Sequence, residues 1–258
     1  MQRALRMLIV LTTLAALPAT AALRRATFFP KDLDMQQAGD LELDTRIGVL
    51  HTENNNNVVL PDFALNFGID RRLEFDIDAQ GGIDPRTGQW LAQDQLWVSG
   101  KHLIWDSHGK DEAWAFGVQQ GPRFGVMPNT WGFGYQALAL LGVRALHWQG
   151  VMTLGGFVDP QDLNTWVRPI GLLAGLDWTF DLMGDWDLAP SLAFTLHGDG
   201  NIDAVATVDL EVDVGKWGSA RVGVMGGWQD AGRVIGFEVG YAPKFAILPK
   251  KLPATSRP

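Results

Sequence analysis

The sequence predicts an all-β protein, a transmembrane antiparallel up-and-down β-barrel of about twelve strands. Three observations predict it. Stretches of about ten residues alternate between apolar and polar side chains and end at Gly, Pro, Asn or Asp. The connections between these stretches are long and short in turn, as in barrels of bacterial outer membranes. An export signal precedes all of them.

The amino-terminal segment has the three parts of an export signal. Two arginines precede an apolar run, residues 7–17, that is too short to span a bilayer, and an A-x-A motif ends at Ala21. We therefore expect residues 1–21 to be a signal peptide and residues 22–40 to be a periplasmic lead-in. After the signal, no segment has the roughly 20 consecutive apolar residues that a membrane helix needs.

Composition narrows the class of protein further. The formal net charge of −8 argues against nucleic acid as a partner, and 0 Cys means that no disulfide framework supports an exported fold. The 11 Trp residues are what a membrane barrel would place at its two interfaces with water.

The alternation is clearest in residues 73–80. Leucine, phenylalanine, isoleucine and alanine take the odd positions, and three acids and a glutamine take the even ones. Residues 41–50, 204–214 and 234–245 alternate in the same way. Marking every such stretch predicts strands at 41–52, 58–69, 73–81, 94–105, 113–120, 133–141, 145–157, 170–181, 189–197, 203–214, 219–229 and 234–245.

The connections give the orientation. If the amino end starts in the periplasm, the outward connections include the long ones, residues 82–93, 121–132 and 158–169. The periplasmic connections are shorter, at residues 70–72, 106–112, 142–144, 182–188 and 215–218. Barrels sort their loops in this way, whereas a soluble sandwich has no reason to do so. We expect the barrel to span residues 41–245 and a carboxy-terminal tail to occupy residues 246–258.

In this barrel the oily strand faces contact lipid and the polar faces line a wet lumen. Leu73, Phe75 and Ile77 are therefore expected to face outward. The expected lumen-lining residues are Glu42, Asp44, Arg46, Glu74, Asp76, Asp78, Lys101, Asp209, Glu211, Asp213, Arg221 and Glu238. Because acids outnumber bases in this set, such a lumen attracts cations.

Nothing in the sequence predicts an enzyme. The five His are scattered without metal-ligand spacing, and no H-x-S pair is present. Ser99 and Lys101 share a strand face, but a catalytic lysine would have to be buried and depressed in pKa, and this strand face is expected to be wet. We expect no catalytic residues, no cofactor and no metal site.

The segment Phe67–Ile83, FGIDRRLEFDIDAQGGI, resembles the turn-and-strand signature of the family named for the MetA pathway of phenol degradation. Residues 101–124, 172–196 and 236–245 are similar to later parts of that family. The resemblance implies an outer-membrane β-barrel of the kind labelled a transporter. Two departures are that Gly121-Pro122-Arg123 replaces the usual Pro-Thr-Gly and that the chain continues past the aromatic Phe245.

Three functions follow from these patterns. The first is a passive outer-membrane channel for small solutes, aromatic or hydrophobic ones among them, with outer-membrane lipid as its surroundings. The second is a non-conducting structural or binding barrel, which bulky inward residues such as Arg46, Trp97, Lys101 and Arg221 would close. The third is a soluble periplasmic β-protein.

Overall fold

A computed structural model of the chain describes residues 35–53, 57–83, 85, 95–107, 112–125, 130–229 and 232–247. The expected signal peptide at residues 1–21 lies outside the described residues, as do residues 22–34 of the lead-in and residues 248–258 of the tail. Among the described residues, no helix is long and apolar enough to cross a membrane.

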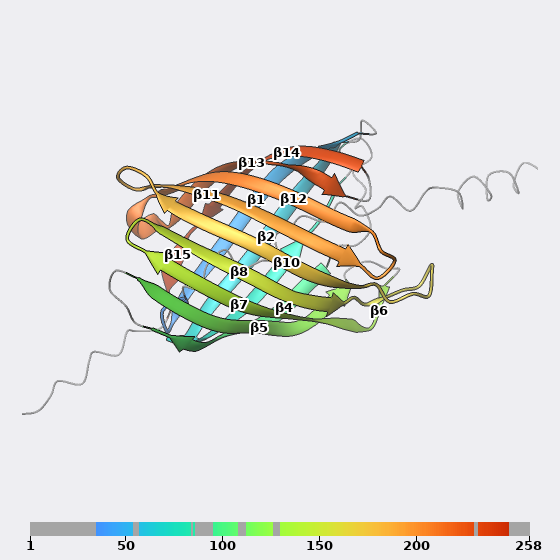
Figure 1. Ribbon diagram of the computed structural model, residues 1–258, viewed down its shortest axis with the longest axis horizontal. Coiled ribbons are helices and arrows are strands. Elements are labelled where there is room, and N and C mark those ends of the chain that lie inside the picture. Colours follow the sequence, from blue (N-terminus) through green and yellow to red (C-terminus); the bar gives the residue numbers. More distant parts are fainter. Residues whose placement is uncertain are drawn as a thin grey trace, which may run out of the picture.

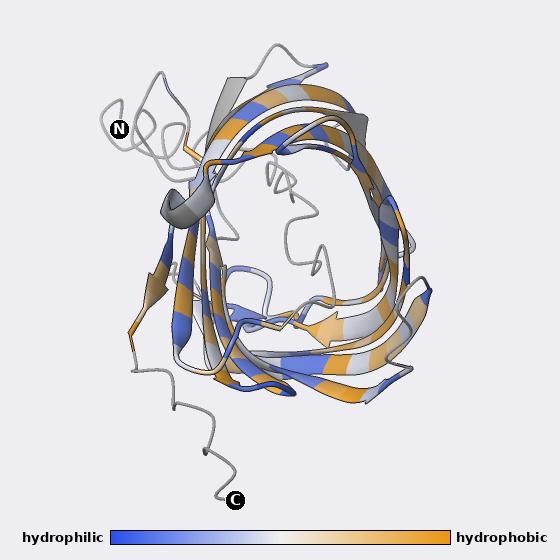
Figure 2. Ribbon diagram, turned by 90° about the vertical axis from the view of Figure 1, so that its left-hand side faces the viewer, coloured by the Kyte–Doolittle hydropathy of each residue, from blue (hydrophilic) through white to orange (hydrophobic). Residues whose placement is uncertain are grey.

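The fold is a closed antiparallel barrel of 12 strands, so the predicted fold class is confirmed. Each strand pairs with the next one along the chain, and β14 pairs with β1 to close the wall (Figures 1 and 2). The wall consists of β1 (Asp40–Thr52), β2 (Asn57–Asp70), β3 (Leu73–Gln80), β4 (Gln95–Asp106), β5 (Ala113–Gly125), β7 (Phe133–Ala145), β8 (Trp148–Val158), β10 (Ile170–Asp181), β11 (Trp186–His197), β12 (Ile202–Asp213), β13 (Ser219–Gln229) and β14 (Gly232–Ala242).

Four short elements extend the ends of the barrel. After Pro243 the chain continues as β15 (Lys244–Ala246), which pairs with the first residues of β1. Strands β6 (Thr130–Trp131) and β9 (Gln161–Asp162) form a separate two-stranded sheet. A 3-10 turn, η1 (Gly215–Trp217), connects β12 to β13.

We call the end where β1 begins the base and the opposite end the rim. The long connections follow β3, β5 and β8 at the rim, where the structure describes residues 81–83, 85, 130–132 and 159–169. The base carries shorter connections such as residues 71–72, 146–147 and 182–185. The barrel therefore sorts its loops by length as the sequence predicted.

Several predicted strand ends are wrong. Strand β11 begins at Trp186 and not at residue 189, and two other differences lie at a glycine. Strand β5 continues to Gly125, because Gly121-Pro122-Arg123 pairs with Gly134–Gln136 of β7 instead of starting a loop. The turn between β7 and β8 lies at Leu146–His147 and not at residues 142–144. In both places a glycine indicated a break, but the ladder of the sheet continues through it.

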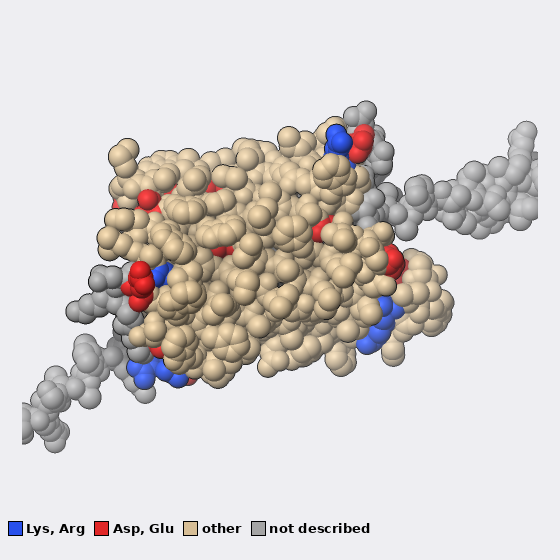
Figure 3. All heavy atoms as spheres, viewed as in Figure 1, with Lys and Arg blue, Asp and Glu red and all other residues tan. Residues whose placement is uncertain are grey.

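The outer surface of the barrel is apolar. Alternate side chains point away from the axis, and apolar ones such as Val224, Phe237 and Leu154 are 50–61 % exposed. Hydrophobic and hydrophilic residues alternate along the strands of the wall (Figure 2). Most charged atoms on the face seen in Figure 3 lie near its two ends. This is the surface of a barrel whose side contacts hydrocarbon.

Exposed tryptophans mark both ends of the apolar band. At the rim these are Trp131, Trp166 and Trp228, and at the base they are Trp105, Trp114, Trp148, Trp186 and Trp217. Because indole rings prefer the headgroup level of a bilayer, this distribution fits a membrane-spanning barrel with a water interface at each end.

Candidate functional site: the inner wall of the barrel

The inner wall is formed by the alternate side chains that point toward the barrel axis. Many of them are nearly inaccessible, with Trp97 1 %, Asp76 2 % and Gln119 4 % exposed. The wall was expected to be wet and lined mainly by polar side chains. Instead, its charged side chains contact one another closely, and one part of it is apolar.

An ion-pair cluster lies on the wall formed by β13, β14 and β1. Asp44 Oδ2 accepts hydrogen bonds from Arg46 Nη2 at 2.8 Å and from Arg221 Nη2 at 2.9 Å. Arg46 Nη1 also lies 3.7 Å from Glu238 Oε1. A carboxylate that holds two guanidinium groups is strongly held in place, because both hydrogen bonds are charge-assisted.

A glycine makes room for this cluster. Gly240 lies between Arg46 and Arg221 on the neighbouring strands, and a Cβ atom there would be 2.9 Å from Arg46 Cγ and 3.0 Å from Arg221 Cγ. The two arginine stems therefore extend over the bare backbone of β14. Small and large inward residues alternate in this way in small barrels generally.

A second polar network crosses β3, β4 and β5. Lys101 Nζ donates to Glu74 Oε1 at 3.1 Å, while Gln119 Nε2 donates to both Asp76 Oδ2 and Ser99 Oγ at 2.9 Å. Asp76 Oδ1 and Gln119 Oε1 receive no hydrogen bond from any described residue. The lysine that shares a strand face with Ser99 is thus paired with a carboxylate.

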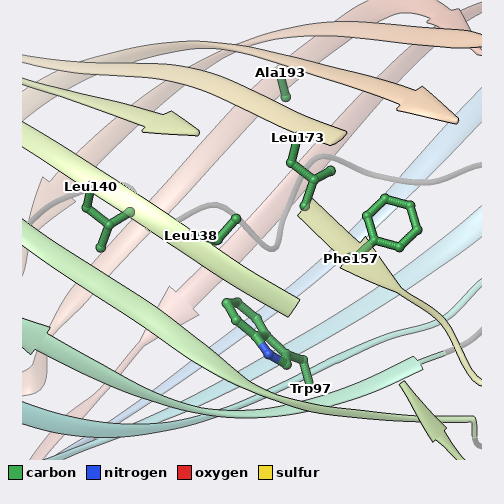
Figure 4. Packing of buried hydrophobic residues seen from close by; sticks show 6 residues of the cluster. All are labelled: Trp97, Leu138, Leu140, Phe157, Leu173 and Ala193. Atoms are coloured by element: carbon green, nitrogen blue, oxygen red, sulfur yellow. The ribbon is translucent and has the colours of Figure 1, made fainter. Parts of the chain in front are cut away.

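Next to this network the wall carries an apolar stripe. It is formed by buried side chains of β4, β7, β8, β10 and β11, namely Trp97, Leu138, Leu140, Phe157, Leu173 and Ala193 (Figure 4). Glycines again leave the space, since a Cβ at Gly155 would be 2.8 Å from Leu138 Cδ2 and one at Gly171 would be 2.6 Å from Phe157 Cε1. Trp97 Nε1 donates to the carbonyl oxygen of Gly121 at 3.2 Å, which satisfies the indole in this apolar setting.

Toward the rim the apolar stripe meets two further polar pairs. Arg123 Nη1 lies 3.1 Å from Asp159 Oδ1, and its guanidinium lies 4.6 Å from the centroid of the Phe157 ring. His197 Nε2 is 2.9 Å from Asp203 Oδ2. The His197 ring approaches Phe157 edge-on, with centroids 6.3 Å apart.

At the base, the end of the lead-in reaches the inner wall. The backbone N–H of Gln36 donates to Glu74 Oε2 at 2.5 Å, and the N–H of Gly39 donates to the carbonyl oxygen of Gly68 at 2.8 Å. Gly68 is required there, because any Cβ would overlap the carbonyl oxygens of Gln36 and Gln37.

The structure places the expected lumen-lining residues in several settings. Asp44, Glu74, Asp76, Lys101, Asp209, Arg221 and Glu238 are buried, and Glu42, Arg46, Asp78 and Glu211 are half-buried. Glu42 pairs with Lys244 at 3.0 Å near the base. Asp213 is exposed at the end of β12, where its Oδ1 accepts a hydrogen bond from the Gly215 N–H at 2.7 Å.

Several inward residues were not expected from the sequence. Arg123 was assigned to a loop because Gly-Pro precedes it, and Gln119 and Asp159 carry no distinctive pattern. Trp97 was expected to point inward, but the rest of the apolar stripe was missed, because β7 and β8 are apolar on both faces, which removes the period-two signal. In the described part of the chain, no three His, Cys, Asp or Glu side chains are arranged to hold a metal ion.

Comparison with known proteins identifies relatives by fold. Neither the family models nor the characterised protein sequences compared with this chain match it. Among solved structures, the NanC porin matches at a TM-score of 0.60 and 11% identity, over 78% of this chain and 98% of that chain. An outer-membrane channel from Pseudomonas putida F1 matches at 0.59 and 11% identity, over 84% and 99% of the two chains. The KdgM porin matches at 0.56 and 10% identity, over 79% and 99%. The chain thus has the barrel fold of these outer-membrane porins and channels.

Proposed function

We propose that the protein is a passive outer-membrane channel for small solutes. The observation that carries the proposal is the contrast between the two faces of one closed wall. The outer face is apolar with tryptophans at both ends, while the inner face carries ion pairs, hydrogen-bonding groups and an apolar stripe. Such a barrel is stable in lipid and offers solutes a path whose chemistry its inner side chains set.

The inner wall favours cations over anions. The inward bases are Arg46, Lys101, Arg123 and Arg221, and each of them already lies within 4.0 Å of a carboxylate. The inward acids are more numerous: Glu42, Asp44, Asp62, Glu74, Asp76, Asp78, Asp159, Asp177, Asp203, Asp209, Glu211 and Glu238. The surplus of carboxylates raises the local concentration of cations.

The apolar stripe adds a preference for solutes with an apolar or aromatic body. Burying such a body against Trp97, Leu138 and Phe157 removes apolar surface from water, which is favourable. One KdgM structure of the same fold, with a TM-score of 0.50, contains oligogalacturonate. A uronate polymer is anionic, so the acidic wall of this chain disfavours it.

The resemblance of Phe67–Ile83 to the phenol-degradation family supports the same proposal. This segment forms the hairpin of β2 and β3, whose inward acids Asp76 and Asp78 belong to the cation-attracting wall. Membership in that family is part of our proposal.

A planar-bilayer recording tests the proposed function. We expect the purified protein to produce unit conductance steps in potassium chloride, with a reversal potential that indicates cation preference. The near-complete burial of inward side chains such as Trp97 and Glu238 favours the competing function, a non-conducting structural or binding barrel. The complete absence of conductance from correctly folded protein would select that competitor.

A further inference from the structure

One part of the inner wall has hydrogen-bond acceptors without donors. We call it the acceptor group and define it as Asp76 and Gln119, whose unpaired oxygens are described below, together with Asp78, the half-buried acid two residues along the same face of β3. The Gln119 side chain is 4 % exposed and gives its amide hydrogens to Asp76 and Ser99, but its Oε1 receives no hydrogen bond from the described residues. Asp76 is 2 % exposed and its Oδ1 is likewise without a described donor.

The nearby bases are engaged elsewhere. Lys101 Nζ lies 3.1 Å from Glu74, and Arg46 contacts Asp44 and Glu238. Within the described part of the chain, no lysine or arginine nitrogen forms a salt bridge with Asp76 or Asp78. A buried carboxylate is costly without a cationic partner, and buried acceptors are rarely left without a donor.

The acceptor group borders the apolar stripe. Asp78 of β3 is directly opposite Trp97 of β4 in the antiparallel ladder, and Asp76 is opposite Ser99. Trp97 belongs to the stripe that continues through Leu138 of β7 and Phe157 of β8. Hydrogen-bond acceptors without donors thus lie next to an apolar surface on the same stretch of wall. This combination is typical of a small-molecule site.

We propose that the acceptor group binds the ammonium group of an organic amine whose apolar body lies along the stripe from Trp97. The inference deepens the proposed function, because it names a solute class for the channel. A primary ammonium has three N–H donors and no acceptor, which matches a set of oxygens that lack donors. Its charge compensates the two carboxylates, and its hydrocarbon or ring packs against the stripe.

The same geometry disfavours a metal ion. In the described residues no three acidic or imidazole side chains converge on one point, and a neutral amide supplies one of the acceptors. Divalent metal ions prefer several charged oxygens or water, and an adjoining tryptophan contributes neither.

The test uses full-length protein in planar bilayers with 2-phenylethylammonium as the probe. We expect the probe to reduce the potassium current in a concentration-dependent manner. The neutral isostere 2-phenylethanol and the small cation ethylammonium are expected to need at least about tenfold higher concentrations, since a tenfold difference corresponds to one lost charged or apolar contact. Equal block by 2-phenylethanol would overturn the role of the carboxylates.

Three variants locate the site, and one serves as a matched control. Asp76→Asn, Asp78→Asn and Gln119→Leu are each expected to raise the half-blocking concentration of the probe about fivefold or more. Glu211→Gln removes an inward carboxylate from β12, on another part of the wall, and is expected to leave block unchanged. An equal loss of block in Glu211→Gln would show that the overall charge of the lumen controls block by the probe. The acceptor group would then not be a binding site.

Calorimetric titration of the protein in detergent separates this inference from the proposed function. Probe binding that is lost in Asp78→Asn, in a barrel that does not conduct, would uphold the site and contradict the channel. Conductance without probe binding or block would uphold the channel and contradict the site. The folded state of each variant is checked by its mobility on gels before and after boiling.

Discussion

Arg221 on β13 and Asp44 on β1 form an ion pair across the intervening strand β14, with Nη2 2.9 Å from Oδ2. The pair connects strands from the two ends of the chain, because β1 and β14 meet only when the barrel closes. Gly240 of β14 leaves the space through which the arginine reaches the carboxylate. The ion pair therefore forms only in the closed barrel, and it stabilises the closed state.

Loss of this arginine is expected to destabilise the closed barrel. Arg221→Met removes a charge-assisted hydrogen bond at a site where both side chains are largely buried, so we expect the free energy of unfolding to fall by about 2–3 kcal/mol. Urea titration of the protein folded into lipid vesicles measures it. Asp213→Asn, at the exposed base, is the control and is expected to change the free energy by less than about 0.5 kcal/mol. Equal losses of unfolding free energy in both variants would mean that the ion pair across β14 contributes no more to stability than an exposed carboxylate.

The apolar outer band predicts a depth-dependent cost of charge. Phe237 lies at the middle of β14 and is 50% exposed, so Phe237→Arg is expected to cost about 2–4 kcal/mol of unfolding free energy in lipid. Phe245 is 49% exposed but lies in β15 at the base, where Phe245→Arg is expected to cost about 0–1 kcal/mol. The same vesicle titration compares them. A larger cost at Phe245 would contradict the placement of the band.

The glycines beneath the apolar stripe are expected to be intolerant of a methyl group. A Cβ at Gly155 would overlap the carbonyl oxygen of Ala137 and lie 2.8 Å from Leu138 Cδ2, so Gly155→Ala requires backbone movement and is expected to cost about 1–3 kcal/mol. At Gly100 the nearest atom to a new Cβ is 4.0 Å away, so Gly100→Ala is the matched control with little expected effect. The midpoints of denaturant unfolding give the comparison, and destabilisation confined to Gly100→Ala would refute the packing argument.

The acid surplus predicts cation preference that weakens with salt. Screening shortens the reach of the wall charges from about 8 Å at physiological ionic strength to about 3 Å at 1 M. Reversal potentials across a tenfold salt gradient, recorded at low and at high mean salt, measure the effect. We expect Asp78→Asn to lower the cation preference without abolishing conductance. Anion preference in the unmodified protein would mean that the inward acids do not govern permeation.

The alternation of side chains determined most of the fold. In β3, Glu74, Asp76 and Phe75 lie on the faces that their polarity indicates, because a strand with one oily and one charged face can be placed only one way in lipid. The lengths of the connections indicated that the long loops lie at one end of the barrel and the short ones at the other. These are local properties, so a sequence displays them directly.

Only the tertiary structure determined which side chains form the inner wall. Leu138 and Phe157 point inward from strands that are apolar on both faces, so no pattern in the sequence distinguishes their inner side. Arg123 became an inward residue because β5 extends through a Gly-Pro step that pairs with β7.

The contacts of Arg221 with Asp44 and of Gln119 with Asp76 each reach over an intervening strand. Residues on next-but-one strands meet only when strand register and barrel curvature bring them together. Both are set by the pairing of the whole closed sheet, so no single segment contains the information.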